Sequence, residues 1–263
     1  MIDFQKYKRI VVKVGSSTLT HESGSLNLGR IEKLVRVLSD FKNAGKEIVL
    51  VSSGAVSAGV SRLSLGRRPA SIAEKQAMAA VGQSQLMNIY ERFFSEYGLC
   101  VAQLLLTKDV IDSDERRDAA KNTFRELLAL GCIPIVNEND PISTTEIEFG
   151  GNDTLSSYVA LVCGADILIN LSDIDALYTS DPRKHADAER IAVVERIDER
   201  ILAMAGGAGS DRGTGGMLTK LRAAQIVTEA GIPMVIASGI DPHVLYDIAE
   251  DRPVGTLFMA EMK

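Results

Sequence analysis

The chain has 263 residues, of which 46% are hydrophobic, and its formal net charge is -6 at pH 7. A chain of this length and hydrophobic content can bury a large core, which excludes an intrinsically disordered protein. The acidic balance argues against a broad nucleic-acid interface, because such interfaces depend on clustered Lys and Arg side chains.

Short apolar segments alternate with helical patterns along most of the chain, which predicts a three-layer αβα sandwich with a central, mostly parallel sheet. The first predicted elements are a strand at 9–14, a helix from 28 to Gly45, a strand at 47–51, a helix at 71–94, a strand at 99–106 and a helix at 114–130. The later ones are a strand at 132–136, a hairpin around 146–149, a helix at 152–163, a strand at 166–171, a helix at 217–230, a strand at 233–237, a short helix and a last strand near Thr256.

No internal repeat or linker interrupts this pattern, so we expect residues 1–263 to form a single domain with two lobes, about 1–165 and 166–263. The N-terminus has no apolar signal-peptide core, and the most apolar later stretch is too short to span a bilayer. We therefore expect a cytoplasmic protein with neither a membrane nor a nucleic-acid partner.

The cysteines and histidines predict no disulfide and no metal site. Cys100, Cys132 and Cys163 lie in apolar or strand-like surroundings without CxxC spacing, which predicts reduced core thiols. The three histidines are scattered along the chain with no cysteine nearby, so we expect no metal site built from protein side chains.

Glycine- and serine-rich turns follow the first two predicted strands. Lys13 ends the first strand and precedes residues 15–17 (GSS), and the second strand leads into residues 52–54 (SSG). Ligands of open α/β sheets bind at the carboxyl ends of the strands, so both turns belong to one candidate crevice. Gly and Ser also occupy such turns for steric reasons alone, and each turn by itself leaves both interpretations open.

Amides and carboxylates gather at two later junctions. Residues 137–140 (NEND) follow an apolar strand, and residues 150–153 (GGND) begin a helix. Asp140 and Asn152 either make Asx-turns and helix caps, or they bind the polar ends of an amino acid. In the second case a carboxylate accepts from an ammonium group and an amide donates to a carboxylate. These residues alone favour neither interpretation.

A glycine-rich segment, residues 213–220, opens the predicted helix at 217 and places Lys220 in its first turns. It matches neither a P-loop nor a GxGxxG motif, but its amides, helix dipole and lysine can hold a nucleotide phosphate. The alternative is that Lys220 is an ordinary exposed helix lysine. If Lys13 and Lys220 converge, they suit phosphoryl transfer, which needs charge neutralisation more than covalent chemistry. A carboxylate acceptor would need no His or Cys base.

Six segments, in order along essentially the whole chain, together resemble the glutamate 5-kinases of the amino acid kinase family. They are residues 11–20 (VVKVGSSTLT), 51–59 (VSSGAVSAG), 134–143 (PIVNENDPIS), 149–157 (FGGNDTLSS), 173–183 (DIDALYTSDPR) and 213–224 (GTGGMLTKLRAA). The sequence departs from the family at three positions, with Gly151 where Asp is more frequent, Ser172 where Thr is usual and Leu218 where Ser is usual.

The resemblance implies that ATP, with Mg²⁺ held mainly by phosphates and water, phosphorylates the γ-carboxylate of L-glutamate. The product would be L-glutamyl 5-phosphate, made in the first step of proline biosynthesis. The N-terminal lobe would bind glutamate and the C-terminal lobe ATP. The resemblance also implies a homo-oligomer, with the next enzyme of the proline pathway as a further partner. We expect a form without the C-terminal PUA domain that many glutamate 5-kinases carry, because the chain stops at Lys263.

Carried over residue by residue, the resemblance also assigns roles within the site. Lys13 and Lys220 would neutralise the transferring phosphoryl group, and Asp153 would orient them. The implied glutamate ligands are Ser53, Asp140 and Asn152. The implied nucleotide ligands are Lys13, Ser172, Asp173, Thr214, Gly215, Gly216, Met217, Leu218, Thr219 and Lys220.

Two other classes of function compete with this interpretation. N-acetylglutamate kinase and aspartokinase would share the fold and the chemistry. Their sequences resemble one another in a K-x-G-G motif after the first strand, whereas this chain has Lys13-Val14-Gly15-Ser16. A non-catalytic amino-acid or nucleotide sensor would lack one of the charged groups, whereas Lys13, Asp153 and Lys220 are all present.

Overall fold

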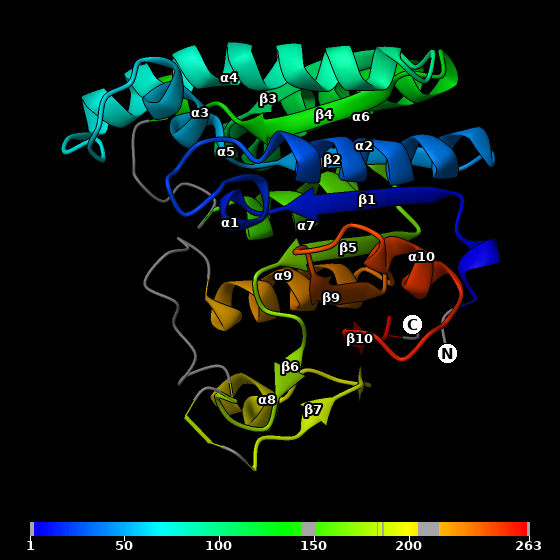
Figure 1. Ribbon diagram of the computed structural model, residues 1–263. Coiled ribbons are helices and arrows are strands. Elements are labelled where there is room, and N and C mark those ends of the chain that lie inside the picture. Colours follow the sequence, from blue (N-terminus) through cyan, green and yellow to red (C-terminus); the bar gives the residue numbers. More distant parts are fainter. Residues whose placement is uncertain (1–2, 144–150, 183, 186, 205–215, 262–263) are drawn as a thin grey trace.

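The computed structural model describes residues 3–143, 151–182, 184–185, 187–204 and 216–261. An eight-stranded sheet runs through the molecule in the order β3-β4-β2-β1-β5-β9-β10-β8 (Figure 1). Its strands are β1 (Arg9–Val14), β2 (Glu47–Ser52), β3 (Val101–Leu106), β4 (Ile133–Glu138), β5 (Ile167–Ser172), β8 (Val193–Val194), β9 (Met234–Ser238) and β10 (Thr256–Phe258). Every neighbouring pair is parallel except β9 and β10, so the predicted mostly parallel sheet is confirmed.

Helices cover both faces of the sheet and complete the predicted three layers (Figure 1). Successive side chains of a strand point to opposite faces, so Val11 and Val12 belong to different apolar clusters. The cluster around Val12 includes residues of α2 (Leu28–Asn43), α4 (Ile72–Ser95) and α10 (Val244–Ala249). The cluster around Val11 includes residues of α6 (Asp114–Ala129), α7 (Asn152–Cys163) and α9 (Met217–Glu229).

Shorter elements connect these layers. They are η1 (Phe4–Lys6), α1 (Ser16–Leu19), α3 (Ala55–Arg62), α5 (Lys108–Asp112), η2 (Asp140–Ile142), β6 (Leu177–Tyr178), β7 (Arg190–Ile191) and α8 (Glu199–Met204). Strands β6 and β7 form a separate two-stranded sheet, which lies near α8 below the main sheet in Figure 1. The hairpin predicted around 146–149 lies outside the described residues.

Local signals place the boundaries of the long helices. The Ser71 hydroxyl accepts a hydrogen bond from the Glu74 backbone N–H at 3.1 Å, as an N-cap serine does, and α4 begins at the next residue. Gly45, Gly98 and Gly131 follow α2, α4 and α6 with positive φ angles of 90°, 68° and 80°. Only glycine adopts this left-handed conformation without strain, so these residues end the helices.

Helices α3 and α4 approach so closely that two glycines are required where they cross. A Cβ atom on Gly59 would lie 2.0 Å from the Met78 carbonyl oxygen, and one on Gly82 would lie 1.8 Å from the Ala55 carbonyl oxygen. This contact fixes α3 against α4, and α3 directly follows the turn that carries Ser53.

The prediction of three core thiols is wrong for one cysteine. Cys163 is buried and Cys132 is half-buried, but Cys100 is exposed. Cys100 immediately precedes β3, which is the edge strand of the sheet and is covered on fewer sides than the central strands. All three cysteines are free. Within the part of the chain that the structure describes, no helix is long and apolar enough to cross a membrane.

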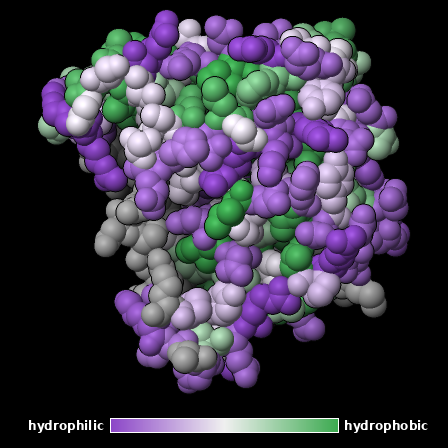
Figure 2. Space-filling view, in the orientation of Figure 1, coloured by the Kyte–Doolittle hydropathy of each residue, from purple (hydrophilic) through white to green (hydrophobic). Residues whose placement is uncertain are grey.

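Figure 2 shows that polar side chains cover most of one face of the molecule and that hydrophobic residues appear there in small groups. The apolar side chains of the central strands are instead buried, with Ile10, Val11 and Val12 of β1 at 0% exposure. The buried polar groups at the carboxyl ends of the strands are therefore the exceptional feature of this core.

Candidate active site

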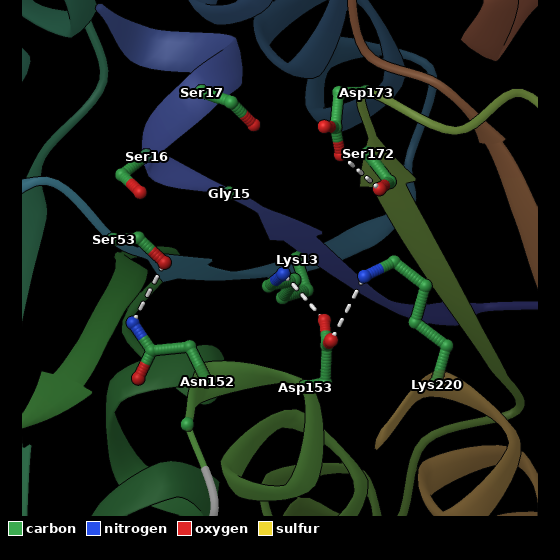
Figure 3. Close-up of a pocket in the computed structure, with 11 residues that line it drawn as sticks. Lys13, Gly15, Ser16, Ser17, Ser53, Asn152, Asp153, Ser172, Asp173 and Lys220 are labelled. Atoms are coloured by element: carbon green, nitrogen blue, oxygen red, sulfur yellow. Dashed lines mark hydrogen bonds and ion pairs between the residues drawn. The ribbon is translucent and has the colours of Figure 1, made fainter. Parts of the chain in front are cut away.

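A small cleft opens at the carboxyl ends of β1, β2 and β5 and reaches the first residues of α7 (Figure 3). Parallel strands end at the same edge of a sheet, which explains why segments far apart in the sequence meet here. The cleft is lined by Lys13, Gly15, Ser16, Ser17, Ser53, Gly151, Asn152, Asp153, Ser172, Asp173 and Lys220.

Asp153 joins the two lysines that the sequence singles out. Its Oδ1 accepts from Lys13 Nζ at 2.5 Å, and its Oδ2 accepts from Lys220 Nζ at 3.0 Å (Figure 3). The exposed fractions of the side chains of Lys13, Lys220 and Asp153 are 7%, 3% and 3%. With both lysines protonated, this buried group carries one net positive charge, which suits an anionic ligand.

Burial and charge act in opposite directions on these groups. Burial alone would raise the pKa of Asp153, but the charges of Lys13 and Lys220 hold the pKa of this carboxyl well below its usual range. Burial lowers the pKa of Lys13, and the neighbouring Asp153 carboxylate opposes that effect. The alternative in which Lys220 is an ordinary exposed lysine is wrong, because Lys220 is only 2% exposed.

Two neutral side chains also form hydrogen bonds with the Asp153 carboxylate. Asn170 Nδ2 donates to Oδ1 at 2.9 Å, and Thr219 Oγ1 lies 3.0 Å from Oδ2. Each carboxylate oxygen therefore has one ammonium group and one neutral donor as neighbours. Asn170 was not predicted from the sequence. The available signal was an amide inside the otherwise apolar run 167–171, directly before the turn at Ser172.

A chain of side-chain amides extends from the cleft to α4. Asn152 Nδ2 lies 2.9 Å from Ser53 Oγ and 2.9 Å from Asn137 Oδ1, and Asn137 Nδ2 donates to Gln83 Oε1 at 2.9 Å. The capping alternative for Asn152 is wrong, because Gly151 is the N-cap residue of α7 and no side chain caps this helix. Asn137 belongs to the predicted polar segment 137–140, although no separate role was assigned to it. Gln83 was missed, and a glutamine in the middle of the apolar helix pattern at 71–94 was the available signal.

Asp140 lies on η2 and does not line the cleft. It is half-buried, and this burial raises its pKa to about 6. The N-cap of η2 is Asn139, without a side-chain capping bond, so Asp140 is not a cap. Helix α4 holds the end of this segment, because Gln76 Nε2 donates to the Ser143 carbonyl oxygen at 2.8 Å.

The residues expected to bind the nucleotide are divided between the cleft and the surroundings of α9. Ser172 and Asp173 line the cleft, and Ser172 Oγ donates to Asp173 Oδ1 at 3.0 Å. The Met217 side chain packs in the core at 3% exposure, whereas Leu218 is 40% exposed, and neither lines the cleft. Gly216 is the N-cap residue of α9. Thr214 and Gly215 lie outside the described residues.

Across the described parts of the chain, no group of three or more His, Cys, Asp or Glu side chains is arranged to hold a metal ion. Asp153, the buried carboxylate of the cleft, has both oxygens next to hydrogen-bond donors. Asp173 is the exposed carboxylate that lines the cleft.

Comparisons with known proteins agree on the family. The model of the "Amino acid kinase family" matches residues 8–238. A glutamate 5-kinase of Clostridium perfringens is 55% identical over 97% of this chain and 96% of its own length, and one of Clostridium tetani is 54% identical over 96% and 95%. A glutamate 5-kinase of Listeria innocua is 50% identical over 97% and 94%. The crystal structure of UMP kinase from Bacillus anthracis superimposes with a TM-score of 0.66 at 18% identity, covering 97% of each chain, which shows a shared fold.

Proposed function

The chain belongs to the amino acid kinase family, and from that premise we propose that it transfers the γ-phosphoryl group of ATP to the γ-carboxylate of L-glutamate. The product is L-glutamyl 5-phosphate, and the reaction is the first step of proline biosynthesis. Relatives named glutamate 5-kinase, at 50–55% identity over nearly the whole chain, support the substrate. The buried pair of lysines on one carboxylate is the observation that carries the proposal.

The chemistry needs alignment and charge neutralisation. A γ-carboxylate oxygen of glutamate attacks the γ-phosphorus of ATP, a new O–P bond forms, and the bond from that phosphorus to the β,γ-bridging oxygen breaks to release ADP. Lys13 and Lys220 donate to the phosphoryl oxygens as negative charge shifts among them, while Asp153 keeps both ammonium groups at the cleft. No general base is required, because the acceptor is already ionised at neutral pH.

Mg²⁺ fits this site as a companion of the nucleotide. Lysine, asparagine and threonine donors already surround both oxygens of Asp153, so this carboxylate is not available as a metal ligand. We therefore propose that the ATP phosphates and water hold the ion, and Asp173 is an exposed carboxylate that lines the same cleft. When bound, Mg²⁺ neutralises phosphate charge and supports the γ-phosphoryl group during transfer.

The amide chain supports a glutamate site on the N-terminal side of the cleft. Asn152 Nδ2 carries two hydrogens and lies near three acceptors, Ser53 Oγ among them. Ser53 therefore keeps a hydroxyl hydrogen that it can donate to a substrate carboxylate. We further propose that the substrate extends beyond the cleft lining to Asp140 on η2, whose negative charge a free ammonium group needs. That contact would distinguish glutamate from N-acetylglutamate.

The nucleotide would occupy the other side of the cleft, against Ser172, Asp173 and the segment 214–220 that leads into α9. This arrangement divides the single domain into a glutamate-binding part, about residues 1–165, and an ATP-binding part, about residues 166–263. The product is a labile acyl phosphate, so rapid transfer to the next enzyme of the pathway would protect it. The resemblance to the family further supports assembly into a homo-oligomer.

The test is formation of an acyl phosphate that depends on the amino acid. The purified chain is incubated with ATP, Mg²⁺ and hydroxylamine, which converts an acyl phosphate into a hydroxamate, in parallel with L-glutamate, N-acetyl-L-glutamate and L-aspartate. We expect hydroxamate and ADP in equal amounts with glutamate, and much less with the other two. Turnover with N-acetylglutamate in preference to glutamate, or ADP release without hydroxamate, would contradict the proposal.

A further inference from the structure

Asn170 is a polar residue in the middle of the apolar sheet. It lies in β5, between the fully buried Ile169 and Leu171, and is itself 0% exposed. Strand β5 is central, with β1 on one side and β9 on the other. Burying an amide at such a position is costly unless its hydrogen bonds are satisfied, so this residue requires an explanation.

The register of the sheet places Asn170 beside Lys13. The two residues are direct partners between β5 and β1, so their side chains leave the same face of the sheet. Both reach the same acceptor, Asp153 Oδ1, at 2.9 Å from Asn170 Nδ2 and 2.5 Å from Lys13 Nζ. Asn170 Oδ1 is buried, and none of the described residues is a hydrogen-bond partner for it.

The pairing of donors on Asp153 is the same at both oxygens, but the two neutral donors differ. The hydroxyl of Thr219 has a second acceptor, the Gly216 carbonyl oxygen at 2.8 Å, and only one hydrogen to share. The only acceptor that the structure describes for Asn170 Nδ2 is Asp153. Of the two neutral donors, Asn170 is therefore the one whose hydrogen bond to Asp153 has no competing acceptor among the described residues.

We propose that Asn170 is a positioning residue for phosphoryl transfer, which holds the Asp153 carboxylate while Lys13 turns from it to the transferring phosphoryl group. This inference rests on the proposed kinase activity. Lys13 Nζ cannot keep a close ion pair with Asp153 and also give all its hydrogens to phosphoryl oxygens. Because Asn170 donates to the same carboxylate oxygen, that oxygen keeps a hydrogen bond when Lys13 moves, and the buried charge is not left unpaired.

A purely structural role explains the observations less well. A leucine, which branches at the same carbon as asparagine but is larger, would fill the position in β5 and would leave no buried side-chain oxygen without a partner there. The amide at position 170 contributes a hydrogen bond to Asp153 at the expense of an unpartnered Oδ1. That exchange is useful if the orientation of Asp153 matters for the reaction.

The test uses Asn170→Leu in the complete chain, with Ser39→Ala as the matched control. Ser39 is also buried, and its Oγ likewise has no partner within the described ranges, but it lies on α2 and does not line the cleft. The unmodified chain is assayed first, because absence of glutamate-dependent turnover there would be a failure of the proposed function. We expect Asn170→Leu to lower kcat about 10- to 100-fold, with the glutamate KM changed by less than about threefold and the unfolding temperature close to that of the control.

A second variant separates positioning from space filling. Asn170→Asp keeps the shape of the side chain, and its carboxyl group can donate to Asp153 only when it is protonated. At saturating glutamate and ATP, the ratio of its kcat to that of the unmodified chain should therefore rise as the pH is lowered from about 8.5 to about 6. A ratio that is reduced but independent of pH would overturn the proposal. So would an Asn170→Leu chain whose kcat stays within about twofold of the unmodified value.

Discussion

The protonation of Asp140 should make the binding of glutamate depend on pH. Its burial raises the pKa to about 6, above the usual range of an aspartic acid, so its carboxyl group becomes protonated as the pH falls through about 6. The protonated form has no charge to offer the ammonium group of glutamate. We expect the glutamate KM to rise as the pH is lowered from 8 to 5, while the ATP KM changes little. Initial rates measured over both substrate concentrations at each pH test this expectation.

Asp140→Ala supplies the control for that pH profile. The variant should have a high glutamate KM at every pH, and the step near pH 6 should disappear from its profile. Its ATP KM should stay close to that of the unmodified chain, because only the partner of the ammonium group is removed. Equal rises in both KM values would mean that Asp140 supports the structure of η2 and does not bind substrate.

Lys13 is expected to act mainly on the chemical step. Removing a preorganised donor of this kind typically lowers kcat about 100- to 1000-fold, so Lys13→Ala and Lys220→Ala should each lose activity on that order. Lys13→Arg should not restore it fully, because the planar guanidinium cannot place its charge as a compact donor beside Asp153. Steady-state kinetics test this, with circular dichroism to show that each variant folds. A normal kcat with only a higher ATP KM would make Lys13 a ground-state anchor for the nucleotide.

At the scale of elements, the crossing of α3 and α4 supports the substrate side of the cleft. Gly82→Ala would drive a methyl group against the Ala55 carbonyl oxygen, and such overpacking typically costs about 1–3 kcal/mol. Because α3 follows the turn at Ser53, its displacement should also raise the glutamate KM. Urea unfolding and substrate kinetics measure the two effects.

Gly29→Ala is the matched control for that crossing. Gly29 is exposed near the start of α2, and an added Cβ there would lie at an ordinary distance of 3.8 Å from Asn27 Oδ1. Alanine is a better helix former than glycine, so this variant should be neutral or slightly stabilised, with unchanged kinetics. Similar losses in both variants would show that the α3–α4 contact has no special importance.

The long elements could be predicted from the sequence because their signals are local. The predicted bounds of β1 and α7 match the structure, since β1 is an apolar run and glycines flank α7 at both ends. Strands β6, β7 and β8 have two residues each, too short for any periodicity, and were not predicted.

The hydrogen-bond partners of Asp153 were only partly predicted from the sequence. Asn170 reaches it because β5 pairs with β1 in one particular register, which the sequence does not state.

At the scale of the whole molecule, the buried excess of positive charge should make stability depend on the phosphates of the ligand. ATP at about 100 times its Kd adds about 2.7 kcal/mol to the free energy of unfolding, and for a chain of this size that raises the unfolding temperature by several degrees. AMP lacks the β- and γ-phosphates that Lys13 and Lys220 are proposed to meet, so it should raise the unfolding temperature much less. Thermal unfolding with equal concentrations of ATP and AMP tests this prediction. Equal increases in the unfolding temperature would contradict the proposed position of the phosphates.

The sheet order has a consequence for how the protein is made. Strand β1 leaves the ribosome before both of its neighbours in the sheet, β2 and β5, and β5 begins only at Ile167. Until β5 has been synthesised, one hydrogen-bonding edge of β1 has no native partner, which leaves a nascent chain open to mispairing. Lys220 arrives later still, on α9. A stalled chain that ends between β5 and α9 could pair Lys13 with Asp153 but would hold only one of the two buried cations, so catalytic competence should come after the central strands have joined.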